Sequence, residues 1–451
     1  MLPVKAMSTI QAYRLQFQPA MSRLCKSSFV KNVLIVMSGS AIAQIIGFAL
    51  SPIISRLFSP SDFGVFGSFN SVAGIVAAGV TLQYTQAIML PKEKEDALNL
   101  FCISCLCTII VGFLCLIVCL FSAASVNNLM KTGGTWALAL LVLATIVAGL
   151  NQSCQAWCVR VKAFKHTSAS QAVRSISSNG AQIGLGYVRG GAGALIVASV
   201  LGDLLASLNL VRVLLPDLFS LKGAIRWDRM KLLAKEYRDF PMYSASQNVL
   251  NALSSGLPVL LLAHFYGILV AGAYAFGVRM LQVPMSFVLG ALRQVLFQKA
   301  AETQHQGGSL TPLYLKTTVG LFAMALLPSS ILFIWAPQLF TWIFGSQWYV
   351  AGEYARSLVL WLLVVFCNLP AVLFARLIRI QRAVFFYDMA LLGLRVLALV
   401  LGGLYLSALQ TISLFSVVGA AMNAILILLV GYAVMKKEGH TGLESIRECL
   451  L

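Results

Sequence analysis

The sequence is dominated by apolar runs of about 20 residues, the length that an α-helix rising about 1.5 Å per residue needs to cross roughly 30 Å of hydrocarbon. Transmembrane β-strands would need runs about half as long. Hydrophobic residues make up 59% of the chain and charged residues 11%, whereas soluble domains carry roughly 45–50% and 25%. The sequence therefore predicts an all-α polytopic membrane protein.

The apolar runs predict about twelve transmembrane helices, with eleven as the alternative count. Six lie in the first half, near 32–54, 64–90, 98–121, 135–156, 168–187 and 193–215. Six lie in the second half, near 242–264, 268–292, 313–335, 354–377, 384–406 and 412–435. The third, ninth and twelfth are almost purely apolar and are predicted to face lipid.

The polar segment between the two sets of spans divides the chain into two lobes. We predict a cytoplasmic basic tail, an N-terminal six-helix lobe, a cytoplasmic inter-lobe linker, a C-terminal six-helix lobe and a cytoplasmic tail, over residues 1–31, 32–215, 216–241, 242–435 and 436–451. A weak internal similarity, Gly64-Val65-Phe66 against Gly272-Ala273-Tyr274, suggests that the lobes are parallel repeats with the substrate held in a central cavity between them.

The orientation follows from the positions of the 33 Lys and Arg residues, because positively charged loops resist translocation. With the N-terminus inside, most of these residues fall on the cytoplasmic side. This predicts a multi-pass protein of the bacterial inner membrane with both termini in the cytoplasm. The net charge of +18 is then divided among loops on two sides of a bilayer, which argues against a nucleic-acid partner and favours anionic lipid headgroups.

Polar side chains within spans must face protein or a water-filled cavity. The fifth and seventh spans are rich in Ser, Asn and Gln, and the first two also carry polar residues. We expect these spans to line a wet interior. The candidate hydrogen-bonding residues there are Gln44, Asn70, Asn248 and Asn251.

Three cations and two acids fall within the spans, where a charge is costly and usually functional. Arg279 and Arg395 lie near the middle of the eighth and eleventh spans, and Arg174 lies closer to the cytoplasmic end of the fifth. Asp203 and Asp388 lie in the sixth and eleventh. One interpretation is that they form structural pairs, Asp203 with Arg174 and Asp388 with a neighbouring Arg. The other is that the surplus of arginine binds an anionic, phosphorylated cargo, since guanidinium grips phosphate oxygens in bidentate fashion.

Enzymatic and metal chemistry are not predicted. Cys102 and Cys105 form a C-x-x-C pair, but no second pair or His cluster supplies the four ligands of structural zinc. The predicted outer loops are short and carry no catalytic constellation, which argues against a membrane-bound polymerase or ligase. We therefore expect no cofactor, no metal and no catalytic residue.

Several motifs resemble those of the polysaccharide-biosynthesis flippases, which include the O-antigen exporters of the multidrug/oligosaccharidyl-lipid/polysaccharide superfamily. They are Arg56–Gly64 (RLFSPSDFG), Ala87–Pro91 (AIMLP), Tyr237–Pro241 (YRDFP), Gly272-Ala273-Tyr274 with Arg279 and Pro284, and Phe344–Trp348 (FGSQW). The likeness extends over nearly the whole chain. Relatives often carry an Arg and a Glu where this chain has Gln83 and Thr85, so one charge pair of the family is missing.

The resemblance implies alternating access and movement of an undecaprenyl-pyrophosphate-linked oligosaccharide, such as an O-antigen repeat unit, from the inner to the outer leaflet. It carries over most firmly to Arg279, which lies within a matching motif. Arg395, Arg174 and the polar residues would complete the substrate site, and Asp203 and Asp388 are candidates for ion coupling. A polysaccharide polymerase and a chain-length regulator would be further partners. The alternative function is a drug or cation antiporter of the same superfamily, which predicts an acidic cavity.

Overall fold

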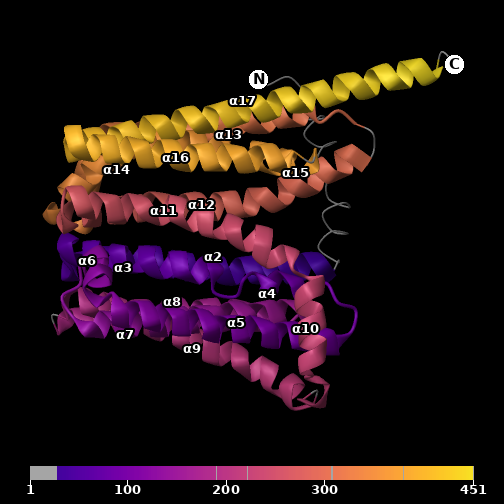
Figure 1. The fold of residues 1–451 in the computed structure, drawn as a ribbon. Coiled ribbons are helices and arrows are strands. Elements are labelled where there is room, and N and C mark those ends of the chain that lie inside the picture. The colour runs from indigo at the N-terminus through magenta and orange to yellow at the C-terminus, as the bar shows by residue number, and fades with distance from the viewer. Residues whose placement is uncertain (1–27, 189, 221, 306–307, 379, 450–451) are drawn as a thin grey trace, which may run out of the picture.

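The computed structural model describes residues 28–188, 190–220, 222–305, 308–378 and 380–449. Residues 1–27 of the predicted basic tail lie outside this range. Every regular element in the described ranges is helical, and most of the helices run side by side in one bundle (Figure 1).

The first lobe is built from six long helices and two short ones. The long helices are α2 (Ser28–Leu57), α3 (Pro60–Gly79), α5 (Lys94–Phe121), α7 (Thr135–Arg160), α8 (Phe164–Tyr187) and α9 (Gly191–Ser220). The short ones are α4 (Tyr84–Ala87) and α6 (Ala123–Met130). In Figure 1 these helices form the indigo and purple half of the bundle.

The second lobe follows a connection made of η1 (Lys222–Ala224), α10 (Trp227–Glu236) and η2 (Phe240–Ser244). Its long helices are α11 (Ala245–Phe265), α12 (Ile268–His305), α13 (Thr311–Phe344), α14 (Tyr349–Cys367), α16 (Gln381–Tyr405) and α17 (Ala408–Cys449), with the short elements η3 (Ser346–Trp348) and α15 (Leu369–Leu377). Helix α10 crosses one end of the bundle, and α17 projects beyond the same end (Figure 1).

Each predicted span coincides with a long helix, which confirms an all-α polytopic membrane fold. Within the described ranges, nine helices are long and apolar enough to cross a membrane. The remaining predicted spans are α2, α3 and α8. Helix α2 is apolar over the shorter stretch Ala43–Leu57. In α3 and α8 polar side chains lower the mean hydropathy, and many of those on α8 face the cavity described below.

Two spans are interrupted where the sequence predicted continuous helices. Helix α3 ends at Gly79, and the left-handed backbone of Leu82 (φ 46°) and Gln83 (φ 59°) separates it from α4. The tenth span is divided at Asn368, because Pro370 in the following turn cannot donate a helical hydrogen bond. Helix α3 begins at Pro60, four residues before the predicted span, in a capping box in which Ser59 and Asp62 satisfy each other's backbone N–H groups.

The two lobes contact each other at a lobe junction, which we define as Pro60–Gly64 of α3 against Ile268–Phe276 of α12, together with Phe344–Trp348. Phe276 stacks on Trp348 with ring centroids 3.9 Å apart, and Phe63 packs edge-on against both rings. The Trp348 indole and the Gln347 amide both donate to the Ser55 carbonyl, over 2.8 and 2.6 Å. The junction closes this end of the space between the lobes.

Candidate functional site

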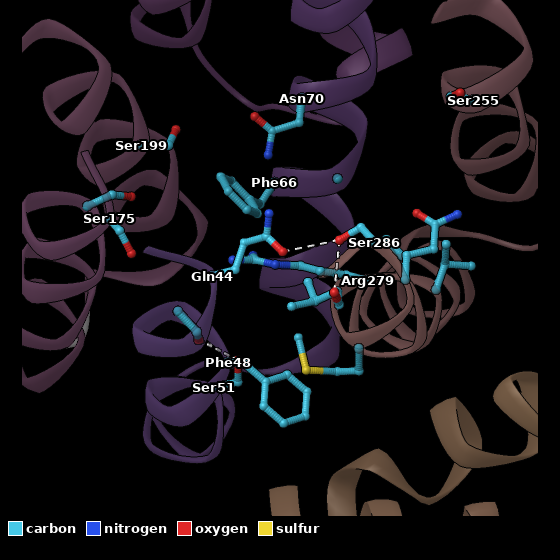
Figure 2. A pocket seen from close by; sticks show the side chains of 18 of the residues that line it. Gln44, Phe48, Ser51, Phe66, Asn70, Ser175, Ser199, Ser255, Arg279 and Ser286 are labelled. Atoms are coloured by element: carbon cyan, nitrogen blue, oxygen red, sulfur yellow. Dashed lines mark hydrogen bonds between the residues drawn. The ribbon is translucent and has the colours of Figure 1, made fainter. Parts of the chain in front are cut away.

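A cavity of about 1050 Å³ lies between the lobes. Helices α2, α3, α7, α8, α9, α11 and α12 supply most of its walls, and α14, α16 and α17 each contribute one side chain, Trp361, Arg395 and Phe415. Amide and hydroxyl side chains alternate with apolar and aromatic ones over its surface (Figure 2). The walls include α2, α3, α8 and α11, the four spans that the sequence predicted to line a wet interior.

Arg279 projects from α12 toward the middle of the cavity, beside Gln44 of α2 (Figure 2). Its side chain is exposed to the cavity, and no acid in the described ranges forms an ion pair with it. Arg174 of the opposite lobe lies within electrostatic range. Ser286, two turns further along α12, donates to the Gln44 amide oxygen over 3.3 Å and links the two lobes beside this cation.

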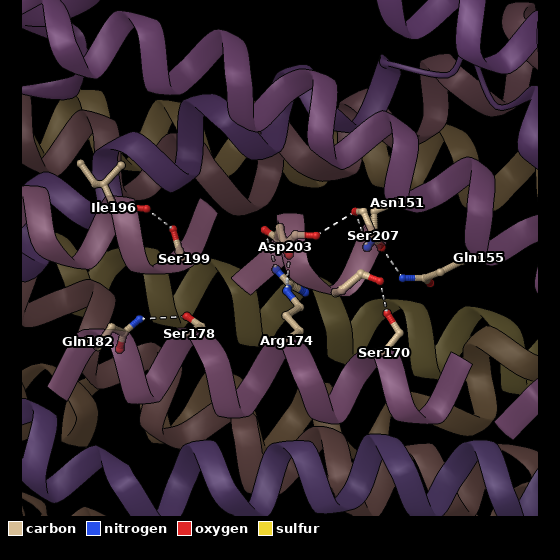
Figure 3. Close-up of polar contacts among 11 residues, drawn as sticks. Asn151, Gln155, Ser170, Arg174, Ser178, Gln182, Ile196, Ser199, Asp203 and Ser207 are labelled. Carbon is tan, nitrogen blue, oxygen red and sulfur yellow. Dashed lines mark hydrogen bonds and ion pairs between the residues drawn. The ribbon is translucent and has the colours of Figure 1, made fainter. Parts of the chain in front are cut away.

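Arg174 differs from Arg279 because Asp203 of α9 neutralises it. The Arg174 Nε forms an ion pair with Asp203, and Nη2 donates to the second carboxylate oxygen over 3.3 Å (Figure 3). This is the structural pair that the sequence left open. Polar contacts continue along the same interface, where Asn151 of α7 donates to Ser207 of α9 over 3.0 Å and Ser207 donates to the Asp203 carbonyl.

Arg395 occupies a third environment, at the wall that the second lobe gives to the cavity. Its guanidinium carbon lies 4.6 Å from the ring centre of Trp361 and 4.9 Å from that of Phe415. Only 8% of the residue is exposed, and its Nε and Nη2 atoms have no hydrogen-bond partner. Cation–π contact is therefore the main compensation for this buried charge.

The charge of the cavity wall follows from these placements. Among the described residues that line it, three are arginines and one is an aspartate, Asp203. Within a low-dielectric bundle such a surplus favours an anion.

The structure brings together part of the predicted site. Arg279, Arg395, Arg174, Gln44, Asn70 and Asp203 all line the cavity. Asn248, Asn251 and Asp388 are not among the lining residues, and Asp388 forms no ion pair within the described ranges. Their proposed roles in binding and coupling stay predictions.

Sequence reasoning missed several lining residues. Asn151 and Gln155 lie on α7, a span that was not recognised as polar, although their spacing of four places both on one helical face. Gln282 and Ser286 follow Arg279 at the third and seventh positions, which is the same face of α12. A search for polar residues in register with Arg279 would have found this second pair.

The chain is similar in sequence to one protein family and in fold to several proteins of known structure. The family model described as "Polysaccharide biosynthesis protein" matches residues 53–353. Among curated proteins, none matches the chain in sequence. Among solved structures, the inward closed conformation of the lipid II flippase MurJ is similar with a TM-score of 0.68 and 11% identity, over 91% of this chain and 93% of that one.

Two transporters of the MOP superfamily are also similar. One is a multidrug resistance MATE family transporter in an inward-facing conformation, with a TM-score of 0.65 and 16% identity over 89% of this chain and 95% of that one. The other is a transporter from Pyrococcus furiosus, with a TM-score of 0.55 and 16% identity over 90% and 94%. At these identities the likeness establishes the fold. The family match covers most of the chain and includes six of the cavity-lining helices, α3, α7, α8, α9, α11 and α12, the last with Arg279. The chain belongs to the polysaccharide biosynthesis protein family.

Proposed function

We propose that this protein is a flippase that moves a lipid-linked, pyrophosphate-bearing oligosaccharide from the inner to the outer leaflet of a bacterial cytoplasmic membrane. No covalent bond is broken in this process. The protein only has to carry a charged and heavily hydroxylated headgroup past a hydrocarbon barrier. The family supports a role in polysaccharide biosynthesis, and a flippase for a lipid-linked substrate shares the fold.

The observation that carries the proposal is Arg279, a cation in a cavity between two lobes that has no acidic partner among the residues the structure describes. An unpaired charge in a membrane protein is expensive and points to a ligand of opposite sign. A guanidinium offers two parallel N–H groups, which match two oxygens of a phosphoryl group. The amides and hydroxyls around it are suited to sugar hydroxyls, and the isoprenoid tail can stay in lipid.

An alternating-access mechanism would give transport through this cavity a direction. The lobe junction closes one end of the cavity. The distribution of Lys and Arg among the loops predicts that this end faces the outside, so the cargo would enter from the cytoplasmic side. Rearrangement of the lobes would then release it outside. Asp203, paired with Arg174 at the cavity wall, is the better placed of the two candidates for ion coupling. A polysaccharide polymerase would receive the cargo beyond this step.

A drug or cation antiporter is the competing function, since the same fold serves a multidrug transporter. Cationic drugs require an acidic site. The described lining carries one acid, and that acid is already paired with an arginine. The charge of the cavity therefore favours the anionic cargo.

The test is transport by variants of Arg279 reconstituted in vesicles, with appearance of a lipid-linked oligosaccharide in the opposite leaflet as the measurement. Arg279→Ala should slow transport by about 10–100-fold, the effect of one lost charge-assisted contact. Arg279→Lys should retain part of the rate because it keeps the charge and loses the bidentate geometry.

Arg293→Ala is the matched control, because it removes an exposed arginine from the same helix outside the cavity lining. It should transport at the wild-type rate. Undiminished transport by Arg279→Ala at normal protein levels would refute the proposal that this cation binds the cargo.

A further inference from the structure

The second lobe contains a buried set of hydrogen-bond donors that have no acceptor within the described part of the chain. Its unpartnered atoms are Nε and Nη2 of Arg395, Nε1 of Trp361, Oη of Tyr387 and Oγ of Ser416. The guanidinium and the indole can only donate, and both hydroxyls can donate. We call these four residues the donor cluster.

The donor cluster centres on Arg395 at the cavity wall. The Arg395 guanidinium lies against both Trp361 and Phe415, whose rings also contact each other edge-on, and Ser416 follows Phe415 on α17. Tyr387 lies about two turns before Arg395 on α16, within electrostatic range of its charge. Arg395, Trp361 and Phe415 also line the central cavity, so the donor cluster adjoins the space occupied by Arg279.

Comparison of the two lobes shows what this cluster lacks. In the first lobe Asp203, on the helix that follows Arg174, supplies a carboxylate. In the second lobe the helix that follows Arg395 presents Gly419, where a Cβ atom would lie 2.8 Å from Nη2. The guanidinium packs so closely against Gly419 that a methyl group would not fit there, and within the described residues no acid forms an ion pair with Arg395. More than nine-tenths of Arg395 is buried, so its charge calls for an anion from outside the chain.

The geometry of the unpartnered atoms indicates which kind of anion they would bind. Nε and Nη2 form one edge of the guanidinium, and their two N–H bonds run parallel, which matches two oxygens of one phosphoryl group. The indole and the hydroxyls provide donors for the remaining oxygen. A neutral sugar hydroxyl would leave the charge uncompensated, and a halide would use only part of the donor set.

We propose that Arg395, Trp361, Tyr387 and Ser416 form a second anion site, in the C-terminal lobe, that takes one phosphoryl group. The group comes either from the headgroup of the lipid-linked cargo or from free inorganic phosphate. Trp361 and Phe415 cover the site and move aside to admit the anion. The cargo branch of this inference rests on the flippase function proposed above, and the phosphate branch does not.

The experiment measures thermal unfolding of the full-length protein in phosphate-free detergent micelles. One arm titrates inorganic phosphate against sodium chloride at equal ionic strength. The other adds undecaprenyl pyrophosphate, with undecaprenol as the uncharged control. The wild type should gain stability in at least one arm, and Arg395→Lys should weaken the apparent affinity about tenfold or more, since one charge-assisted contact is lost.

Tyr387→Phe and Ser416→Ala keep the test valid if Arg395 variants fold poorly. Each removes a buried hydroxyl that has no partner, so the variant without anion should be at least as stable as the wild type. Its stabilisation by the anion should shrink. Tyr314→Phe is the matched control, because that hydroxyl donates to the Ile427 carbonyl over 2.6 Å. It should lower stability and leave the anion effect unchanged.

A second matched pair of variants tests the packing of Gly419 against the Arg395 guanidinium. Gly419→Ala should reduce the anion effect by placing a methyl group against Arg395 and Trp361. Gly393→Ala, on the helix of Arg395 and with open space around it, should not.

The outcomes separate the two branches. An Arg395-dependent shift with inorganic phosphate assigns free phosphate, and a shift with undecaprenyl pyrophosphate alone assigns the cargo headgroup. Equal shifts in the wild type, Arg395→Lys and Tyr387→Phe in both arms, or no shift in the wild type, would overturn the site. This readout needs no transport. Loss of the flippase function with an intact Arg395-dependent shift would leave the site standing, and Arg279-dependent transport without that shift would refute the site alone.

Discussion

At the scale of single residues, the three cavity arginines carry the same guanidinium group in three different environments. Arg174 is neutralised by Asp203, Arg279 extends unpaired into the cavity, and Arg395 is enclosed by aromatic rings. A guanidinium stays charged in all three places. The difference therefore lies in what compensates the charge: a carboxylate for Arg174, a π-system for Arg395, and no acid within the described residues for Arg279.

The Arg174–Asp203 pair should be only modestly stabilising, because 60% of the arginine side chain and 30% of the aspartate side chain are accessible to the cavity. A double-mutant cycle with Arg174→Ala and Asp203→Ala should give a coupling energy of about 1 kcal/mol or less, measured by unfolding in detergent. The exchanged pair Arg174→Asp with Asp203→Arg should recover most of this coupling. A coupling of several kcal/mol would instead show that the pair is a principal link between α8 and α9.

Sequence reasoning reached the charged residues more readily than the polar ones. A charge within an apolar run is conspicuous, so Arg174, Arg279, Arg395 and Asp203 were identified before their positions were known. Whether each arginine is paired with an acid could not be decided from the sequence, because pairing depends on which helices are neighbours. The structure shows the surroundings of each arginine separately. Asn248 was proposed from the composition of its span alone, which does not say which face of the helix meets the cavity.

At the scale of elements, α10 is attached to the first lobe rather than suspended between the lobes. The Arg229 guanidinium holds the Asp96 carboxylate in a bidentate contact over 2.7 and 2.6 Å. Asn99 of α5 accepts from the Arg226 backbone N–H and donates to the Ala224 carbonyl. The sequence predicted a polar inter-lobe linker here, and the contacts with α5 show where its helix is attached.

Asn99 should matter more to this attachment than Arg229. Only 1% of Asn99 is exposed, and Asn99→Ala would remove two partly buried hydrogen bonds to the backbone, at a cost of about 2 kcal/mol. Arg229→Ala breaks a contact at the surface and should cost about 1 kcal/mol or less. Proteinase K cleavage within residues 222–236 and the free energy of unfolding are the measurements. Faster cleavage of the Arg229 variant than of the Asn99 variant would contradict this order.

The helices themselves were the most predictable elements, because length and apolarity are local properties of the chain. Interruptions were less predictable. The left-handed turn after α3 lies at Leu82 and Gln83, and neither residue is the glycine that usually adopts such a backbone. The twelfth span was expected to face lipid, yet α17 supplies Phe415 and Gly419 to the surroundings of Arg395. A run of apolar residues does not distinguish lipid from an aromatic protein interior.

At the scale of the whole molecule, the two weakly similar motifs of the lobes meet face to face. A Cβ atom on Gly64 would lie 2.1 Å from the Ile268 carbonyl oxygen, and one on Gly272 would lie 1.8 Å from the Pro60 carbonyl oxygen. Each glycine thus admits the backbone of the opposite lobe. The similarity of the two motifs is visible in the sequence. The contact between them depends on how the lobes associate, so it could not be predicted from either half alone.

This reciprocal contact implies that closure at the lobe junction depends on the absence of side chains. Gly272→Ala places a methyl group where the Pro60 carbonyl and the Gly64 nitrogen now lie, so the lobes must separate at this end. The displaced junction includes the Phe276–Trp348 stack. We expect the variant to favour a conformation open at that end and to transport more slowly, since a flippase must close each end in turn.

The measurement is the distance between spin labels on Thr135 of the first lobe and Tyr405 of the second, both exposed, in a cysteine-depleted background that retains transport. Gly272→Ala should shift the distance distribution to longer values. Gly290→Ala, on the same helix with nothing within 4 Å of its added Cβ, should reproduce the unsubstituted distribution and rate. Unchanged distances and normal transport in Gly272→Ala would mean that α12 accommodates the methyl group by a local shift. Closure would then rest on the aromatic contacts and on the hydrogen bonds to Ser55, and not on the close approach of the two backbones.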